Sequence, residues 1–148
     1  MSSLTAERLH ELVEIRLRQN QLRYTKGRQI IVETLFASGH PLSISEIERL
    51  APALPRSSAY RHLLDLQSVG AVRSVTSSGD FTHFELSEDL TEHHHHLICL
   101  RCNAIRDVAP SSDFEVVVER AVTDLTKSTG FEALSHSLDV MGYCANCR

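Results

Sequence analysis

The four cysteines of the chain come in two pairs, and cysteine is a residue type well suited to binding a metal ion. Cys99 and Cys102 are separated by two residues, and so are Cys144 and Cys147. Four thiolates in two C-x-x-C elements are typical of tetrahedral zinc, and a site with four protein ligands is structural rather than catalytic. We therefore predict that these cysteines bind a structural Zn²⁺ that ties the first pair to the C-terminus. A redox dithiol and chance pairing are the alternatives.

A run of four histidines precedes the first cysteine pair. In a strand, alternate side chains face opposite sides. His93 and His95 would then face one way, and His94 and His96 the other. The run therefore predicts two ligands for each of two metal sites, since imidazole binds zinc, iron, nickel or copper and carboxylates complete harder sites. A solvated histidine cluster without metal is the alternative.

The charge distribution divides the chain into two modules. Residues 1–75 hold 10 Lys/Arg against 7 Asp/Glu, whereas residues 76–148 hold 5 against 12. A basic half is where a phosphate-binding surface is expected. No apolar run is long enough to cross a membrane, and the charged N-terminus lacks an apolar signal core. We expect a cytoplasmic protein without a membrane partner.

The basic half has the element order of a winged helix-turn-helix. Apolar residues recur at helical spacing in residues 4–20, and two short strand patterns, "AVRSVT" and "DFTHFELS", flank the turn "SSG". Three further helices have start and stop signals. These signals are Thr25 and Gly39 for the next helix, Ser43 with Glu46 as a capping box, and Ser57 or Ser58 with Gly70.

A winged helix lays its recognition helix in the major groove of duplex DNA. Arginine binds guanine through two hydrogen bonds, and basic residues nearby contact phosphates. A small helical protein without a DNA role is the alternative. The predicted DNA-binding residues are Arg56, Ser57, Ser58, Tyr60 and Arg61 at the recognition helix, and Arg23, Lys26 and Arg28 at the backbone.

The acidic half predicts an α/β module. A strand ending at Cys99 leads through a tight turn to a strand over residues 104–108. A helix capped by Ser112 or Asp113 then runs to Gly130, before a last strand that carries Leu134, His136, Leu138 and Val140 on one face. This unit is too small for a large core of its own, so we expect it to pair with a second copy as a homodimer.

From about Leu17 to Arg148 the chain resembles the ferric uptake regulator family of metal-dependent repressors. The resemblance rests on "LRYTKGRQIIVETL", "SSAYRHLLDLQSVGAV", "HHHHLICLRC" and "GFEALSHSLDVMGYCANC". It implies an α+β fold with an N-terminal winged-helix DNA-binding domain over residues 1–86, a hinge over 87–92 and a C-terminal α/β dimerisation and metal-binding domain over 93–148.

The resemblance also implies three metal sites. The four cysteines match the structural zinc site of the family. The regulatory site would comprise His40, Glu85, His94, His96 and Asp107, although His40 lies one residue earlier than in the usual pattern. The second dimerisation-domain site would comprise His93, His95, Glu119 and His136, with Glu115 as the alternative to Glu119.

The hinge departs from the usual pattern of the family. The segment "SEDLTE" is longer than usual, and it adds Glu88, Asp89 and Glu92 as alternative ligands, with His83 nearby. The hinge has no cysteine, and Glu85 occupies the carboxylate position of iron- and peroxide-sensing members. This slightly favours Fe²⁺ or Mn²⁺ over Zn²⁺ as the regulatory metal.

Together these features predict a homodimeric, metal-activated repressor that binds a palindromic double-stranded operator and controls genes of metal uptake or homeostasis. A zinc-sensing or a peroxide-sensing regulator is the alternative within the family. Outside it, the alternatives are a zinc-dependent hydrolase and a DNA-binding protein whose metals are all structural. We expect a regulator and not an enzyme.

Overall fold

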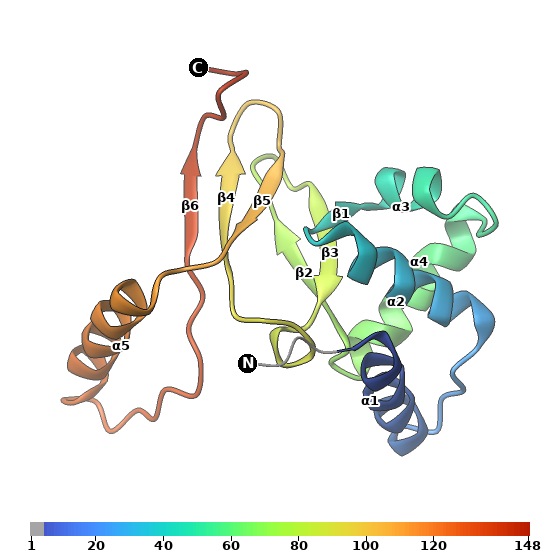
Figure 1. The fold of residues 1–148 in the computed structure, drawn as a ribbon, viewed down its shortest axis with the longest axis horizontal. Coiled ribbons are helices and arrows are strands. Elements are labelled where there is room, and N and C mark those ends of the chain that lie inside the picture. The colour runs from blue at the N-terminus through green and yellow to red at the C-terminus, as the bar shows by residue number, and fades with distance from the viewer. Residues whose placement is uncertain (1–4) are drawn as a thin grey trace.

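The computed structural model describes residues 5–148, and it is an α+β fold, as predicted (Figure 1). Helices α1 to α4 gather around a first sheet, and a second sheet lies beside the first, with α5 standing apart from both. The elements are α1 (Ala6–Gln19), α2 (Lys26–Ser38), β1 (Leu42–Ser43), α3 (Ile44–Leu50), α4 (Arg56–Ser68), β2 (Val72–Thr76), β3 (Thr82–Leu86), the 3-10 turn η1 (Glu88–Leu90), β4 (His95–Cys99), β5 (Ile105–Val108), α5 (Ser112–Thr126) and β6 (Asp139–Gly142).

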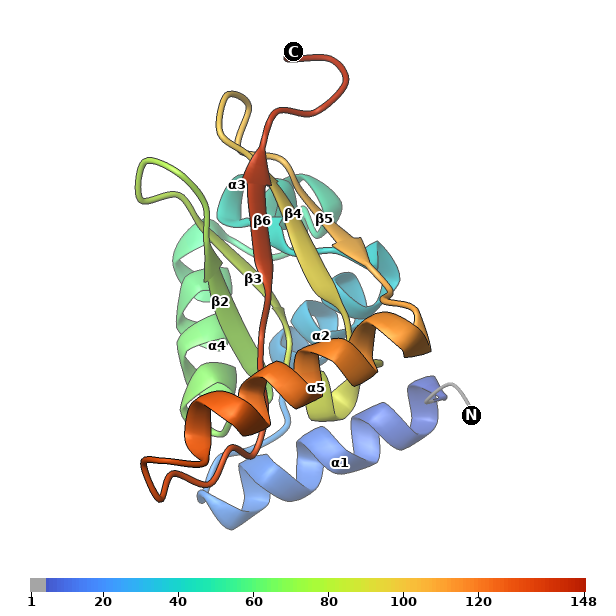
Figure 2. The same cartoon turned by 90° about the vertical axis from the view of Figure 1, so that its left-hand side faces the viewer.

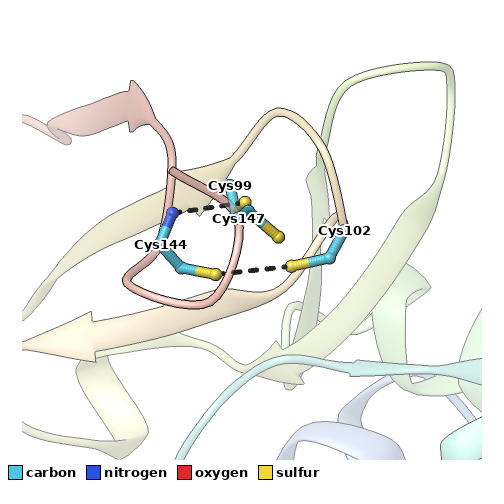
Figure 3. A group of neighbouring side chains, drawn as sticks. All are labelled: Cys99, Cys102, Cys144 and Cys147. Carbon is cyan, nitrogen blue, oxygen red and sulfur yellow. Dashed lines mark hydrogen bonds between the residues drawn. The ribbon is translucent and has the colours of Figure 1, made fainter.

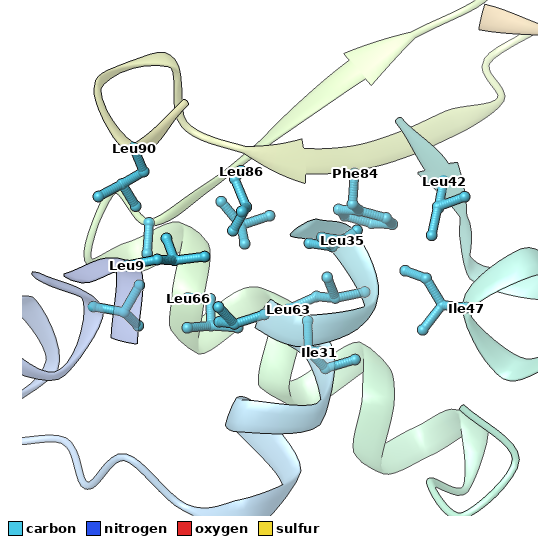
Figure 4. Close-up of a cluster of buried hydrophobic side chains, with 14 of the residues drawn as sticks. Leu9, Ile31, Leu35, Leu42, Ile47, Leu63, Leu66, Phe84, Leu86 and Leu90 are labelled. Atoms are coloured by element: carbon cyan, nitrogen blue, oxygen red, sulfur yellow. The ribbon is translucent and has the colours of Figure 1, made fainter. Parts of the chain in front are cut away.

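The N-terminal sheet has the antiparallel order β1-β3-β2 and packs against the helices. Apolar side chains from α2, α4 and β3 meet in one buried cluster, which includes Ile31, Leu63 and Phe84 (Figure 4). Burial of each large apolar side chain contributes about 1.5–3 kcal/mol. This cluster is therefore what fixes α4 against the rest of the winged helix.

Most of the expected helix boundaries are confirmed. Helix α2 begins after Thr25 and ends at Gly39, which adopts the left-handed conformation at φ 62°. Ser43 and Glu46 form the predicted capping box at α3. The predicted start of the recognition helix was wrong: α4 begins at Arg56, because the carbonyl of Pro55 accepts the first backbone bonds and no serine cap is used.

The C-terminal sheet has the order β5-β4-β6, with β5 antiparallel and β6 parallel to β4 (Figure 2). The helix that follows is capped by Ser111 and not by Ser112 or Asp113, since the Ser111 hydroxyl accepts from the amide of Phe114. The last strand is shorter than predicted. It covers only Asp139–Gly142, because residues 131–138 run beyond the start of β4 and have no strand to pair with.

The two halves contact each other at several places. Leu90, which lies in the predicted hinge, is buried in the N-terminal core, where Leu9 also lies. At the tip of the β2–β3 hairpin, Ser78 donates a hydrogen bond to Asn103 Oδ1 at 2.7 Å. Beside it Val75 is buried together with Ile98 and Ile105 of the second sheet. The hairpin tip is therefore seated on the loop that carries the first cysteine pair.

Helix α5 is exposed or only partly buried along its whole length. Its apolar residues are among the most exposed of their kind, with Val117 64% and Leu125 75% accessible. Exposed apolar surface of this extent marks a site of association. Across residues 5–148, none of the helices combines the length and the apolar character that a membrane span requires.

Candidate metal centres

Three groups of potential metal ligands converge among residues 5–148, and within each group the donor atoms lie within 4.8 Å of one another. Two of the groups come from alternate histidines of the same segment, as strand geometry dictates. We call them the cysteine cluster (Cys99, Cys102, Cys144, Cys147), the hinge cluster (Glu85, His94, His96, Asp107) and the helix cluster (His93, His95, Glu115, His136).

The cysteine cluster joins the turn after β4 to the end of the chain, and its sulfur atoms point toward one another (Figure 3). The sulfurs of Cys102 and Cys144 are 3.8 Å apart. Four sulfurs arranged tetrahedrally about 2.3 Å from zinc are separated by about 3.8 Å. Backbone amides of Cys144, Cys102 and Arg101 lower the pKa of Cys99 to about 6, which favours the thiolate that zinc requires.

The hinge cluster lies where the two sheets meet. Glu85 comes from β3, His96 from β4 and Asp107 from β5, while His94 directly precedes β4. One carboxylate oxygen of Glu85, Oε2, lies 3.1 Å from Nε2 of His94 and 3.2 Å from Nε2 of His96. Asp107 lies 3.8 Å from both rings. Two imidazoles and two carboxylates from both halves of the molecule therefore face one small volume.

The ionisation of the hinge cluster reflects these contacts. Burial opposes the charge of Glu85, but hydrogen bonds from His94 and His96 outweigh burial and hold the Glu85 pKa well below its usual range. The hydrogen bond to Glu85 raises the pKa of His94 to about 9. Burial raises the pKa of Asp107. In the absence of metal, protons therefore balance the negative charge of the cluster.

Second contacts orient both histidines. The backbone carbonyl of Glu92 lies 2.8 Å from Nδ1 of His94, and Asp139 lies 2.9 Å from Nδ1 of His96. Each ring is thus fixed through one nitrogen and turns the other toward Glu85. This is the usual arrangement around metal-binding histidines. The sequence prediction missed Asp139, because its contact depends on the parallel pairing of β6 with β4.

His40 lies outside the hinge cluster as the structure stands. It lines a cavity of 480 Å³ whose walls also include Glu85, His94 and Asp107 of the hinge cluster. Its Nδ1 contacts the carbonyl of Ser38 at 2.8 Å, and its side chain is exposed. The loop after α2 therefore brings His40 to the wall of the site but not among its close donors.

The helix cluster differs from the predicted set by one residue. Glu115, and not Glu119, meets the histidines: its two oxygens lie 2.8 Å from His95, 3.3 Å from His93 and 3.1 Å from His136. Glu119 lies one helical turn further along α5, on an exposed stretch. Glu115 lies in the first turn of α5, and this position brings it to the histidines.

Both histidine clusters have donor sets that fit a divalent cation. Asp107 Oδ1 in the hinge cluster and His136 Nε2 in the helix cluster are buried and lack an aligned hydrogen-bond partner within residues 5–148. Unsatisfied buried polar atoms are costly unless a ligand or ion uses them. Imidazole with carboxylate suits Fe²⁺, Mn²⁺ or Zn²⁺, whereas four thiolates suit zinc.

The predicted DNA-binding residues fall into two groups. Those at the start of α4, apart from the partly buried Ser58, and those at or just before the start of α2 lie at the surface, and Tyr60 is 52% accessible. Arg28 differs: it is buried, its guanidinium lies 2.5 Å from Asp65 of α4, and it donates to the carbonyl of Arg23. Arg28 therefore joins α2 to the recognition helix and does not face a phosphate. The exposed residues are Arg23, Lys26, Arg56, Ser57, Tyr60 and Arg61. Ser58 is partly buried.

Comparison with known proteins agrees with this geometry. The profile of the ferric uptake regulator family matches residues 19–141. The ferric uptake regulation protein of Campylobacter jejuni is 32% identical over 138 residues, which cover 88% of this chain and 83% of that protein. The peroxide operon regulator of Bacillus subtilis is 28% identical over 97% of this chain and 96% of its own.

A solved structure of a relative extends the comparison to the whole fold. The ferric uptake regulator of Helicobacter pylori, described as having three functional metal binding sites, superposes with a TM-score of 0.77 at 27% identity and covers 99% of this chain and 97% of that one. Sequence and fold agree over nearly the full length. The chain belongs to the ferric uptake regulator family and is a metal-responsive transcriptional regulator.

Proposed function

We propose that this protein is a cytoplasmic, homodimeric repressor that binds its operator when the hinge cluster holds a divalent cation, with Fe²⁺ as the favoured metal. The observation that carries the proposal is the hinge cluster itself. Glu85 belongs to the winged-helix side, whereas His94, His96 and Asp107 belong to the other sheet and its approach. An ion held by these four residues supplies positive charge that replaces the protons on the cluster and links the two halves.

The relatives support iron as the metal. The ligand set holds no sulfur, as expected of a site for a harder cation. Regulators named for ferric uptake recur among the relatives, including that of Campylobacter jejuni. We further propose that the cysteine cluster holds a structural Zn²⁺ and that the helix cluster holds a second divalent ion. Three sites in the Helicobacter pylori relative support this number.

The second copy of the chain is expected to cover α5 and the outer face of β6. An amphipathic helix gains most of its stability from burying its apolar face, and none of the residues of this helix is buried by the part of the chain that the structure describes. Its neighbours Leu134 and Met141 are 89% and 64% accessible. We expect Val117→Asp to give a monomer in light scattering, whereas the exposed polar change Thr123→Asp leaves the dimer intact.

In the dimer, two α4 helices would read a palindromic operator, with Tyr60 and Arg61 at the bases and Lys26 at the backbone. Recognition of two half-sites requires a fixed separation of the two helices. Because α4 packs on the same core as β3, the position of Glu85 relative to the second sheet sets this separation.

The experiment is DNA binding with and without metal. A duplex is selected from a randomised pool with zinc-loaded protein and Mn²⁺, and its affinity is then measured with Mn²⁺ or with a chelator too weak to remove the cysteine-bound zinc. We expect tight binding only with Mn²⁺, and loss of the metal effect in His94→Ala and His96→Ala. Equal affinity with and without Mn²⁺ in the wild-type protein contradicts the proposal.

Peroxide sensing is a second candidate, because the peroxide operon regulator of Bacillus subtilis matches nearly the whole chain. It predicts that the Fe²⁺-loaded protein gains the mass of one oxygen on a histidine of the hinge cluster after brief exposure to peroxide. If the histidine peptides are unmodified after peroxide exposure and the protein still binds DNA, metal sensing remains as the function and peroxide sensing is refuted. The relatives carry the names of regulators, and none of these observations supports the hydrolase alternative.

A further inference from the structure

Two charged side chains, Arg73 and Glu88, lie between the hinge cluster and the helix cluster and contact a member of each. Arg73 is on β2, directly across from Glu85 in the sheet register. Glu88 is in η1, within the lengthened hinge segment. Neither residue belongs to the ligand groups themselves. They form a continuous series of charge contacts from one cluster to the other.

At the hinge end, the two oxygens of Glu85 have different partners. Oε1 accepts from Nε of Arg73 at 2.5 Å, and Oε2 faces the rings of His94 and His96. The Glu85 side chain is only 6% accessible, so water does not compete for these contacts. Arg73 therefore fixes the rotation of the carboxylate and leaves a single oxygen for the ligand position.

At the other end, Glu88 stands between Arg73 and a histidine of the helix cluster. Its Oε2 lies 3.7 Å from Arg73, and its Oε1 lies 3.0 Å from Nδ1 of His93. Nε2 of the same ring faces Glu115 at 3.3 Å. The Oε1 atom is buried and has no aligned donor among residues 5–148, so it can accept a hydrogen bond from Nδ1–H of His93.

The turn that carries Glu88 is itself held firmly. Leu90 is 1% accessible in the N-terminal core, and Asp89 pairs with Arg16 of α1. Glu88 therefore projects from a fixed support. A fixed carboxylate transmits a change at His93 to Arg73 more effectively than a mobile one, because little of the displacement is lost in side-chain motion.

We propose that Arg73 and Glu88 are positioning residues that couple the two histidine clusters, so that an ion in one cluster raises the affinity of the other for its ion. The inference rests on the proposed metal binding of both clusters. A histidine that binds metal through Nε2 keeps its proton on Nδ1, and this Nδ1–H group donates a hydrogen bond. That donation fixes Glu88, which fixes Arg73 and, through it, the Glu85 carboxylate. By linkage the effect is reciprocal.

The probe for the test is Mn²⁺ binding to the full-length, zinc-loaded protein, followed by the electron paramagnetic resonance of free Mn²⁺. His136→Ala isolates the hinge cluster, and His94→Ala isolates the helix cluster. If the clusters are coupled, the wild-type isotherm is steeper than the sum of the two single-cluster isotherms. We expect the second ion to bind with an affinity about fivefold higher than in the single-cluster variants, which is the lower end of typical coupling.

Glu88→Gln carries the decisive comparison. In Glu88→Gln the Mn²⁺ isotherm should equal the sum of the two single-cluster isotherms, each measured in a protein that also carries Glu88→Gln. Its matched control is Asp89→Asn in the same turn, which removes only the pair with Arg16 and should keep the fivefold effect. Arg73→Lys is a second variant: lysine keeps the charge beside Glu85 but lacks the fork that reaches both carboxylates, so coupling is lost while each cluster still binds Mn²⁺.

Two results overturn the coupling. One is a wild-type isotherm that equals the sum of its parts. The other is coupling that persists in Glu88→Gln, which would assign it to the backbone shared by the adjacent His93 and His94. Both leave two Mn²⁺ ions bound per chain. A failure of the proposed function looks different, because His94→Ala would then leave the Mn²⁺ stoichiometry unchanged.

Discussion

Asp139 and His96 form a pair across two parallel strands, with the carboxylate 2.9 Å from Nδ1 of the ring. The opposite nitrogen of the ring, Nε2, faces Glu85. Since β6 enters the sheet immediately after the loop from α5, this pair also ties the hinge cluster to the segment that we expect at the dimer interface. One side chain thus links metal-site geometry to the C-terminal strand.

Removal of this support should weaken metal binding at the hinge cluster. For Asp139→Ala we expect Mn²⁺ affinity to fall by about 10- to 100-fold, the usual cost of losing a carboxylate behind a metal-binding histidine. The zinc content of the cysteine cluster should not change. Asp124→Ala is the control, because Asp124 is exposed on α5 and pairs with Lys127 of the same helix. An affinity within twofold of the wild type contradicts the role of Asp139.

Arg28 and Arg61 should give opposite phenotypes although both were predicted to bind DNA. Arg28→Ala leaves Asp65 without its partner, so we expect the free energy of unfolding to fall by about 3 kcal/mol. Arg61→Ala should leave stability within about 0.5 kcal/mol, since the side chain is exposed, and should weaken DNA binding. Urea unfolding and binding to the selected duplex separate the two. Unchanged stability in Arg28→Ala would refute a structural role.

The cysteine cluster should control the stability of the C-terminal sheet. Cys144→Ser is expected to lose one zinc ion per chain and several kcal/mol of unfolding free energy, because binding of a structural metal is coupled to folding. Strand β6 is only four residues long, and Cys144 lies two residues after its end. The neighbouring exposed change Ala145→Ser should alter neither quantity. Retention of zinc in Cys144→Ser would show that the cluster is not the zinc site.

His62 should add an acid-sensitive element to the winged helix. Its pKa is lowered by burial first and also by the nearby cations Arg28 and Arg61, while Asp65 acts in the opposite sense. Because the folded-state pKa lies below the unfolded value of about 6.5, the unfolded chain binds this proton first as the pH falls. The stability that neutral His62 provides is therefore complete above about pH 6.5 and is lost as the pH decreases below it.

The comparison for His62 is the difference in unfolding free energy between the wild-type protein and His62→Gln at pH 7.5 and pH 5.5. Other titrating groups contribute equally to both proteins and cancel. We expect the wild type to lose its advantage over the variant at pH 5.5. A difference that is the same at both pH values, or a ring that titrates near pH 6.5 in an NMR titration of the folded protein, is incompatible with this prediction.

Local patterns predicted some contacts of the site and not others. The division of the histidine run into two pairs follows from strand alternation alone. The choice between Glu115 and Glu119 does not, because residues four apart lie on the same helix face and only the position of the helix start decides which one meets β4. The N-cap of α5 is Ser111, whereas the sequence signals placed the cap one or two residues later, at Ser112 or Asp113.

Contacts between strands were the other gap. Arg73 reaches Glu85 because the hairpin register sets them opposite each other, and Asp139 reaches His96 because β6 pairs with β4 in parallel. Neither pairing has a short-range signature in the sequence. The turn predicted at Ser77–Gly79 would place Arg73 opposite His83, whereas the observed hairpin pairs Thr76 with Thr82 and sets Arg73 opposite Glu85.

The contact between the β2–β3 hairpin and the loop that carries the first cysteine pair limits how the two halves can rotate. To turn the recognition helix away, the molecule must expose Val75, Ile98 and Ile105 and break the bond between Ser78 and Asn103. Exposure of these side chains costs about 3 kcal/mol or more, so this contact opposes free rotation of the two halves. A ligand that prefers another orientation of the two halves must therefore supply that energy.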